Sequence, residues 1–401
     1  MIHSFKLFQI ALFTFLLGFS GNALASDSED YTASVMHHIG DAHQFQIIGS
    51  TYMPLPCIAY SSNGGFFFSL SSAFEYDALN HTSNKAVNGY VIHHDQLFRL
   101  VDAEGNSPEG IIDLNAGHDE HGHSAGHESE DHGKSMKIGE NTYKLEAASA
   151  LQGLSSWYDF SITKNVFGML LISVLLIVIF GIVSSAYKKR EGKAPKGIQS
   201  FFEVLIVFMR DEVVRPAIGP KWEKFFPYLM TAFFFILFAN LLGLIPIFPG
   251  SANITGNLGV TIILALFTFI ITNINGNRHY WGHVFAMPGV PLPILIILTP
   301  IEIVGLFIKP VTLFIRLFAN ITAGHIIIMS LVSLIFVFSE GGQNSGGAVG
   351  GAAIAVPFVF VMNFLELFVA FLQAFIFTLL SSLYIGSAIK DHHHDHEEAH
   401  H

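Results

Sequence analysis

Charged and polar residues recur at helical spacing inside a long apolar stretch, residues 299–338. Glu302, Lys309 and Arg316 are seven residues apart, which places them on one face of a helix because seven residues are close to two turns. Asn320 continues this stripe one turn further. A charge at the centre of a bilayer costs about 2.5–3.5 kcal/mol on insertion scales and usually marks an ion path or a pairing. The pattern therefore predicts a membrane helix whose polar stripe handles ions or protons.

A second apolar stretch, residues 353–389, carries a stripe of its own, with Glu366 and Gln373 seven residues apart. If the two helices are antiparallel and Arg316 lies opposite Gln373, His325 and Glu366 differ in depth by only about 3 Å. Such a histidine–glutamate pair can titrate near neutral pH and relay protons. We expect Arg316 to face a partner and His325 to line a crevice between the helices.

Arg316 has no carboxylate at its own depth in the predicted arrangement. Glu302 is about 21 Å away along the same helix, and Glu366 is offset toward the outer side. We therefore expect the missing carboxylate to come from another subunit. The alternative is that these polar groups only hold helices together, as isolated Asn or Gln side chains in membranes often do.

The surrounding sequence is typical of a polytopic α-helical membrane protein with a small β-rich N-terminal domain. Of its 401 residues, 51% are hydrophobic and only 13% are charged. About 20 apolar residues cross a bilayer, so the pattern predicts about five spans. They are residues 166–187, 225–245, 258–274, 299–338, which Pro310 interrupts, and 353–389. The last two are long enough to require tilt or bending. Residues 198–214 predict an amphipathic helix on the cytoplasmic surface.

Two independent features predict the orientation. Residues 1–25 resemble a signal peptide, with Lys6, an apolar run and a small-residue cleavage site; an uncleaved first span is the alternative. A Lys/Arg cluster at 188–193 follows the first span, and such clusters are enriched on the cytoplasmic side. Both features place residues 26–160 outside the cytoplasm, and five crossings from there leave the C-terminus in the cytoplasm.

The segments outside the membrane domain, 161–390, are polar. Short strands predict a β-rich domain at about 40–115, and a His-rich, low-complexity linker follows at 116–134. Residues 391–401 form an acidic, His-rich cytoplasmic tail. Its HExxH match at 396–400 predicts no zinc site, because nothing beyond it supplies a third ligand or a cleft. We expect no cofactor and no metal.

The cysteine count and the net charge each exclude a property of the chain. Cys57 is the single cysteine, so no disulfide can form within the chain. The net charge of −11 argues against nucleic-acid binding.

The segment PVTLFIRLFANITAGH, residues 310–325, resembles the signature of subunit a of F-type ATP synthases, the stator of the proton channel. The match includes Arg316-Leu317-Phe318, Asn320, Ala323-Gly324 and the titratable His325. The segments ANLLGLIP, 239–246, and ELFVAFLQAFIFTLLSSLY, 366–384, resemble the same family, so the resemblance covers about 161–390. A signal peptide and a long His-bearing outer domain are similar to subunits from the Bacteroidetes group.

The resemblance implies roles for the stripe residues. Arg316 would face the c-ring, lower the pKa of each passing c-subunit carboxylate so that its proton leaves, and block a direct leak between two half-channels. The outer half-channel would be lined by Asn320, His325, Glu366 and Gln373, and Glu302 would serve the cytoplasmic one. In many family members the residues at 325 and 366 are exchanged, Glu then His, which fits one shared proton-handling site.

The resemblance also implies partners: c-ring subunits, b-type peripheral stalk subunits and the lipid bilayer. The chain would not be catalytic by itself. The proton is the default coupling ion, and Na⁺ is the alternative, because the choice rests mainly with the carboxylate site of the partner. The main alternative is a metal-ion transporter that uses the His-rich tracts as metal chaperones. It predicts metal-ligand pairs within the membrane, where His325 is the single histidine and predicted spans two to five contain no Cys or Asp. A plain structural subunit is a third reading, against which the stripes argue.

Overall fold

The structure is a computed structural model that describes residues 40–48, 51–62, 64–77, 82–102, 104–114, 135–138, 141–148, 157–245, 252–285, 287, 290–339 and 343–389. The predicted signal peptide at 1–25, the His-rich linker at 116–134 and the tail at 391–401 lie outside these residues. The chain divides into two compact units. Among the described residues, one includes His325–Phe360, and the other includes Gly40–Gly324 and residues 361–389.

The strands form three antiparallel sheets. The first pairs β1 (Gln44–Ile48) with β2 (Thr51–Pro54). The second has the order β13 (Trp157–Asp159), β3 (Pro56–Ser61) and β4 (Gly65–Leu70). The largest runs in the order β10 (Ile111–Asp113), β7 (Lys85–Val87), β8 (Tyr90–His93), β9 (Gln96–Val101), β12 (Asn141–Ala147) and β11 (Ser135–Ile138), with β5 (Tyr76–Asp77) and β6 (Thr82–Ser83) joined beside β8. The predicted limit near residue 115 was therefore too early, because β11 to β13 complete these sheets.

Local sequence explains how the central hairpins turn. The β7–β8 connection is Asn88-Gly89, and both residues have left-handed φ angles of 48° and 79°. Asn and Gly tolerate this conformation, which the twist of a two-residue hairpin requires. Beneath the hairpins, Trp157 is fully buried, and its ring meets that of Tyr90 edge-on at 5.4 Å. The sequence pattern thus gives a packed β domain rather than loose strands.

The β domain is tied to the first long helix, α3 (Lys164–Lys189), by hydrogen bonds rather than by a free linker. The Lys164 N–H donates to the Ala42 carbonyl at 2.8 Å. The Asp41 carboxylate accepts from the Thr163 hydroxyl at 2.8 Å and from the Asn165 N–H at 3.0 Å. A carboxylate at a helix N-terminus satisfies free N–H groups and opposes the positive end of the helix dipole.

The helices after α3 follow the predicted order. They are α4 (Ile198–Phe208), which continues as a π-helix at Met209–Val214 and α5 (Arg215–Ile218), then α6 (Trp222–Gly243), α7 (Leu258–Ile274), α8 (Arg278–Phe285), α9 (Leu292–Phe338) and α10 (Ser345–Ile389). Within the described residues, four helices are long and apolar enough to cross a membrane, or up to five if α7 and α8, bent by 105°, form one span. The predicted fold class, a polytopic helical membrane protein with a β-rich N-terminal region, is confirmed.

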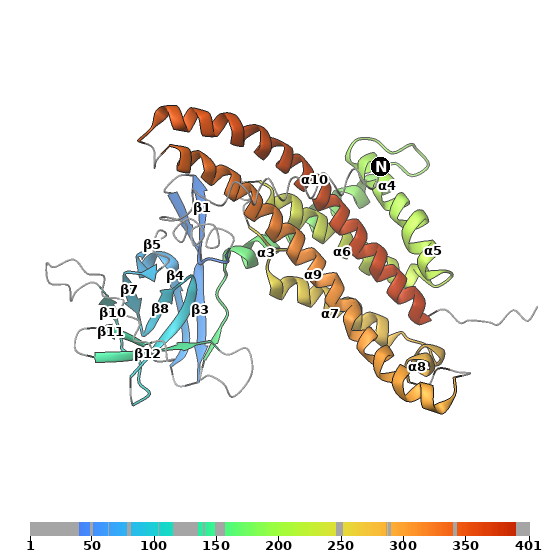
Figure 1. The fold of residues 1–401 in the computed structure, drawn as a ribbon, viewed down its shortest axis with the longest axis horizontal. Helices are drawn as coiled ribbons and strands as arrows, with labels where there is room; N and C mark the ends of the chain where they lie inside the picture. The colour runs from blue at the N-terminus through green and yellow to red at the C-terminus, as the bar shows by residue number, and fades with distance from the viewer. Residues whose placement is uncertain are drawn as a thin grey trace, which may run out of the picture. The chain divides into compact units, whose positions relative to one another are not determined.

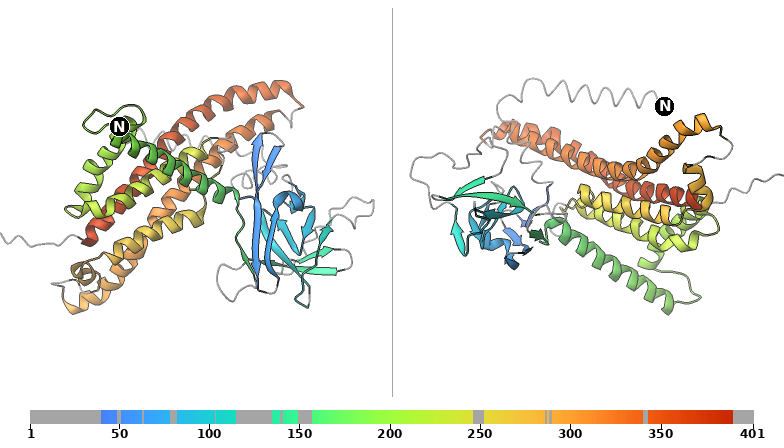
Figure 2. Two further views of the ribbon diagram at one scale, coloured as in Figure 1. Left: turned by 180° about the vertical axis from the view of Figure 1, so that it is seen from behind. Right: turned by 90° about the horizontal axis from the view of Figure 1, so that it is seen from below.

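α6 occupies the centre of the helices in the larger unit. Its Phe234 ring lies 4.8 Å from that of Phe180 on α3. Tyr228 shares a 2.8 Å hydrogen bond with Thr268 on α7. The long helices α9 and α10 run antiparallel and side by side in Figures 1 and 2. The two predicted polar stripes therefore lie on neighbouring helices.

Two predicted interruptions of the helices were wrong. α9 stays helical through Pro310, because a proline inside a membrane helix removes one backbone hydrogen bond that neighbouring groups can replace. The predicted linker at 341–352 is helical from Ser345 onward. A Cβ on Gly351 would lie 3.1 Å from the Cβ of Phe338 on α9, so glycine here serves the close approach of two helices rather than a loop.

Candidate functional site

The helices that carry the two polar stripes approach each other closely at Gly324 and Glu366. The Glu366 Oε1 atom lies 2.8 Å from the position that a Cβ on Gly324 would take. This contact gives α9 and α10 an antiparallel register that differs by one residue from the assumed pairing of Arg316 with Gln373. Glu366 and Gln373 are each only 4% exposed, so both face the packed side of α10. His325 follows Gly324 in the chain and is half-buried.

Arg316 lies at the edge of the surface through which α9 packs. Leu313 and Leu317 on either side of it are buried in the helical core with Ala374 and Phe377. Arg316 itself is half-buried, and the preceding Ile315 is 49% exposed. The guanidinium thus lies between the packed side of α9 and its exposed apolar side. In the described part of the chain, Arg316 forms no ion pair with a carboxylate.

The remaining predicted residues are more dispersed. Asn320 is exposed one turn beyond Arg316 on α9. Glu302 is half-buried on the same helix, about 21 Å from Arg316 at the rise of an α-helix. The structure brings Glu366 against Gly324, with the buried Gln373 two turns further along α10, and it leaves Glu302 apart from them.

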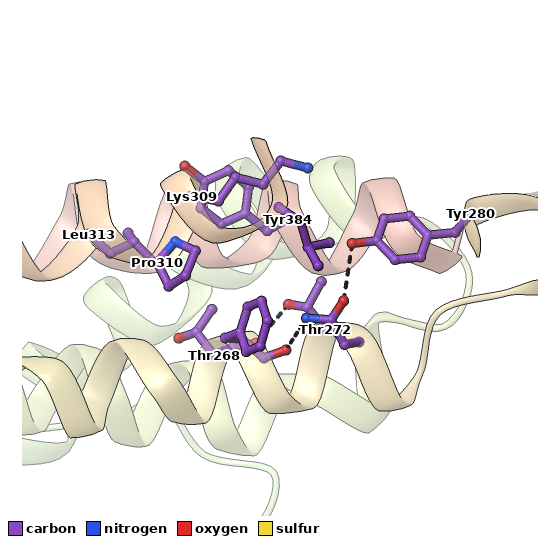
Figure 3. A pocket seen from close by; sticks show the side chains of 10 residues that line it. Thr268, Thr272, Tyr280, Lys309, Pro310, Leu313 and Tyr384 are labelled. Carbon is purple, nitrogen blue, oxygen red and sulfur yellow. Dashed lines mark hydrogen bonds between the residues drawn. The ribbon is translucent and has the colours of Figure 1, made fainter. Parts of the chain in front are cut away.

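A second polar cluster borders α9 closer to its N-terminal end and joins Lys309 of the first stripe to residues of other helices that the sequence did not connect with it. It surrounds a cavity of about 20 Å³ lined from α7, α8, α9 and α10, room for about one water molecule. Figure 3 shows Lys309 beside Tyr384, whose ring centroid lies 5.7 Å from the Lys309 Nζ atom. Thr268 and Thr272, four residues apart on α7, line it together with Tyr280. That four-residue spacing was the signal in the sequence.

Asn240 on α6 is a further residue that sequence reasoning left without a role. It lies in the ANLLGLIP segment and is 2% exposed. Its Nδ2 atom donates to the Ala370 carbonyl on α10 at 3.1 Å, and its Oδ1 atom accepts from the Thr255 hydroxyl at 2.6 Å. Ala370 lies between Glu366 and Gln373, so Asn240 holds the part of α10 that carries both site residues.

The described residues contain no group of three or more His, Cys, Asp or Glu side chains placed to hold a metal ion. The two His-rich tracts lie outside these residues.

Two family models match the chain. The model described as "ATP synthase A chain" matches residues 167–386, which include every predicted site residue. The model described as "Domain of unknown function (DUF8433)" matches residues 34–121, a range that includes strands β1 to β10.

Curated relatives agree with the first family model. "ATP synthase subunit a" of Chlorobium phaeobacteroides is 39% identical over 77% of this chain and 89% of the relative. "ATP synthase subunit a 2" of Chlorobaculum tepidum is 46% identical over 60% of this chain and 67% of the relative. "ATP synthase subunit a" of Anaeromyxobacter dehalogenans is 38% identical, with shares of 74% and 83%. The chain belongs to the ATP synthase subunit a family.

Proposed function

We propose that α9 and α10 form the proton path of an F-type ATP synthase stator, in which protons cross the membrane only by riding the rotating c-ring. The observation that carries this proposal is the register of the two polar stripes, set by the Glu366 carboxylate against Gly324. It brings a buried carboxylate to α9 two turns beyond Arg316, so one helix pair presents a fixed cation and a separate proton-binding group.

Arg316 acts as the positive gate. Its place beside the exposed Ile315 supports an orientation toward a partner outside the chain. A c-subunit carboxylate that passes the guanidinium meets an opposite charge, which lowers the carboxylate pKa and releases its proton. The same charge repels a proton that would move directly between the two half-channels. The c-ring carboxylate then supplies the counter-charge that Arg316 needs within the membrane.

The outer half-channel is lined by Asn320, His325, Glu366 and Gln373. The burial of Glu366 and Gln373 supports this assignment, because polar side chains facing the interior of a membrane bundle usually serve an ion path. Glu302, about 21 Å further along α9, serves the cytoplasmic half-channel. The coupling ion is the proton.

The chain is a multi-pass membrane subunit of the ATP synthase complex and carries out no covalent chemistry itself. It contacts c-ring subunits and b-type peripheral stalk subunits within the bacterial inner membrane. Residues 1–25 act as a signal peptide, residues 26–160 lie in the periplasm, residues 161–390 form the membrane domain, and the tail at 391–401 is cytoplasmic. The Lys/Arg cluster after α3 supports this orientation.

The test is ATP-driven proton pumping in inverted membrane vesicles at equal complex content. Arg316→Ala is expected to abolish pumping while the complex still assembles. Arg210→Ala is the matched control, because Arg210 belongs to neither stripe and pairs with the adjacent Asp211 at 2.8 Å, and it is expected to keep normal pumping. Normal pumping by Arg316→Ala would show that the arginine only stabilises helix packing, and the proposed gate would be withdrawn.

A further inference from the structure

The outward face of the β13–β3–β4 sheet is apolar, which is unusual for an antiparallel sheet that packs on a core with its other face. Such sheets normally alternate apolar side chains toward the core with polar ones toward water. On β3, Cys57 and Ala59 are fully buried, so Ile58 and Tyr60 point outward. The outward positions of the neighbouring strands are Phe66 and Phe68 on β4 and Tyr158 on β13.

The strand register arranges these side chains in rows. Tyr158 pairs with Tyr60, which pairs with Phe66. The next row joins Phe160 to Ile58 by a 2.8 Å backbone hydrogen bond and Ile58 to Phe68 by pairing. We call these six residues the aromatic face. Four of them are strongly exposed, Phe66 at 69%, Phe160 at 62%, Phe68 at 61% and Tyr60 at 48%. Contiguous exposed apolar surface of this kind marks an interaction site.

A third row connects the aromatic face to α3. The Ile162 N–H donates to the Pro56 carbonyl at 2.9 Å, and Pro56 pairs with Leu70. α3 begins only two residues after Ile162, at Lys164, a reach of at most about 7 Å. The Asp41 hydrogen bonds fix this junction. The apolar surface of the sheet is therefore continuous along the chain with α3, an apolar helix long enough to cross a membrane, whose Leu170, Val174 and Ile177 side chains are exposed.

We propose that the aromatic face lies on the surface of the same bilayer that α3 enters, with its side chains at the boundary between headgroups and acyl chains. Tyr is enriched at this boundary because its ring is apolar while its hydroxyl stays hydrated. None of the six side chains carries a charge, so the face has no electrostatic feature that would select a charged protein partner. The β domain would then be held against the membrane at two places, the α3 junction and the aromatic face.

The test uses the full chain in nanodiscs of phosphatidylethanolamine and phosphatidylglycerol. A spin label is attached at Phe66→Cys or Phe68→Cys, with Ile111→Cys as control, because Ile111 on β10 is 66% exposed but belongs to the other sheet. The native Cys57 is fully buried and stays unlabelled. At positions 66 and 68, the ratio of collisions with oxygen to collisions with a water-soluble nickel complex is expected to exceed that at 111 several-fold.

Three results would overturn the proposal. Equal ratios at all three positions would place the aromatic face in water. Low accessibility to both reagents would indicate a protein partner, and dipolar broadening between labels would indicate a second copy of the chain. The unmodified chain provides an independent measurement, because a phospholipid with a photoreactive group near its headgroup should modify residues 65–70 and spare residues 107–113. Equal modification of the two segments would also count against membrane contact.

Discussion

The Glu366 carboxylate lies against the backbone of Gly324, with Oε1 2.8 Å from the position of a Cβ on residue 324. Glycine is therefore the residue that lets a buried carboxylate reach the backbone of α9. Any larger side chain at 324 would meet the end of the Glu366 side chain and displace it. The Glu366 carboxylate, a proposed proton-binding group, would then be shifted but still present. Such a variant tests whether the position of the carboxylate matters for proton transfer.

Gly324→Ala is expected to lower ATP-driven proton pumping roughly tenfold, because misplacing a reacting group by about 1 Å can cost up to about 100-fold in rate. The complex should still assemble, since the clashing atom is the end of a flexible side chain. Gly305→Ala on the same helix is the control, because a Cβ there meets nothing within 4 Å. Equal pumping by the two variants would mean that the position of Glu366 does not limit proton transfer.

The sequence predicts that His325 and Glu366 form a pair. Exchanging the two residue types between these positions tests that pairing. His325→Glu and Glu366→His should each reduce pumping strongly, because each single change leaves two groups of one kind at the site. The double variant restores one histidine and one glutamate, and it should recover a substantial part of the activity. If the double variant loses pumping activity by the product of the two single effects, His325 and Glu366 act independently. Equal complex content in all four membranes is the necessary control.

The sequence predicted the helices best where local signals mark both ends. The bounds of α7, Leu258–Ile274, match the predicted span because the Asn257 side chain caps the first turn at 2.9 Å from the Gly259 N–H and the apolar run ends at Asn275. The spacing of the polar residues placed each stripe on one face of its helix, but the register of α9 against α10 was only assumed, and the contact of Glu366 with Gly324 now gives it.

The features that could not be predicted from the sequence depend on contacts between segments that are far apart in the chain. β12 pairs with β9 more than forty residues earlier, Leu145 opposite Leu100, so no local pattern could place the end of the β domain. The glycines after Ser345 are typical of a loop in water, yet they pack within a helix because a neighbouring helix approaches them. The role of Asn240 was equally hidden, since its two partners, Thr255 and Ala370, lie in other segments.

The hydrogen bonds of Asn240 should contribute to the thermal stability of the folded chain as well as to the position of the site residues. Asn240→Ala leaves the buried Thr255 hydroxyl without its acceptor, which costs about 1–3 kcal/mol for an unsatisfied buried group. The purified chain in detergent should show a lower thermal midpoint, as should Thr255→Val. The thermal midpoint of the double variant should be little lower than that of Asn240→Ala alone, because both substitutions remove the same hydrogen bond.

The control for this cycle is Thr231→Val on α6. Thr231 is exposed, and its hydroxyl donates to the Pro227 carbonyl of the same helix at 2.8 Å, so its loss should change the midpoint little. Fully additive losses for Asn240→Ala and Thr255→Val would mean that the hydrogen bond between α6 and the segment that carries Thr255 adds no stability.

Cys57 offers a measurement on the β domain itself. Its burial, with a smaller contribution from the charge of Asp159, raises the pKa of the thiol to about 12, compared with about 8.5 in an unfolded chain. Because the folded pKa is the higher one, the contribution of the Cys57 thiol to the stability of the fold is complete below about pH 8.5 and is lost as the pH rises toward 12.

At pH 8 the folded chain should react with a thiol-alkylating reagent on the order of 1,000-fold more slowly than the unfolded chain, since only the thiolate reacts. Ile111→Cys provides an exposed thiol in the same molecule, and it should react rapidly while Cys57 remains free. Equal rates for the two thiols in the native chain would show that the core around Trp157 and Cys57 opens readily in solution.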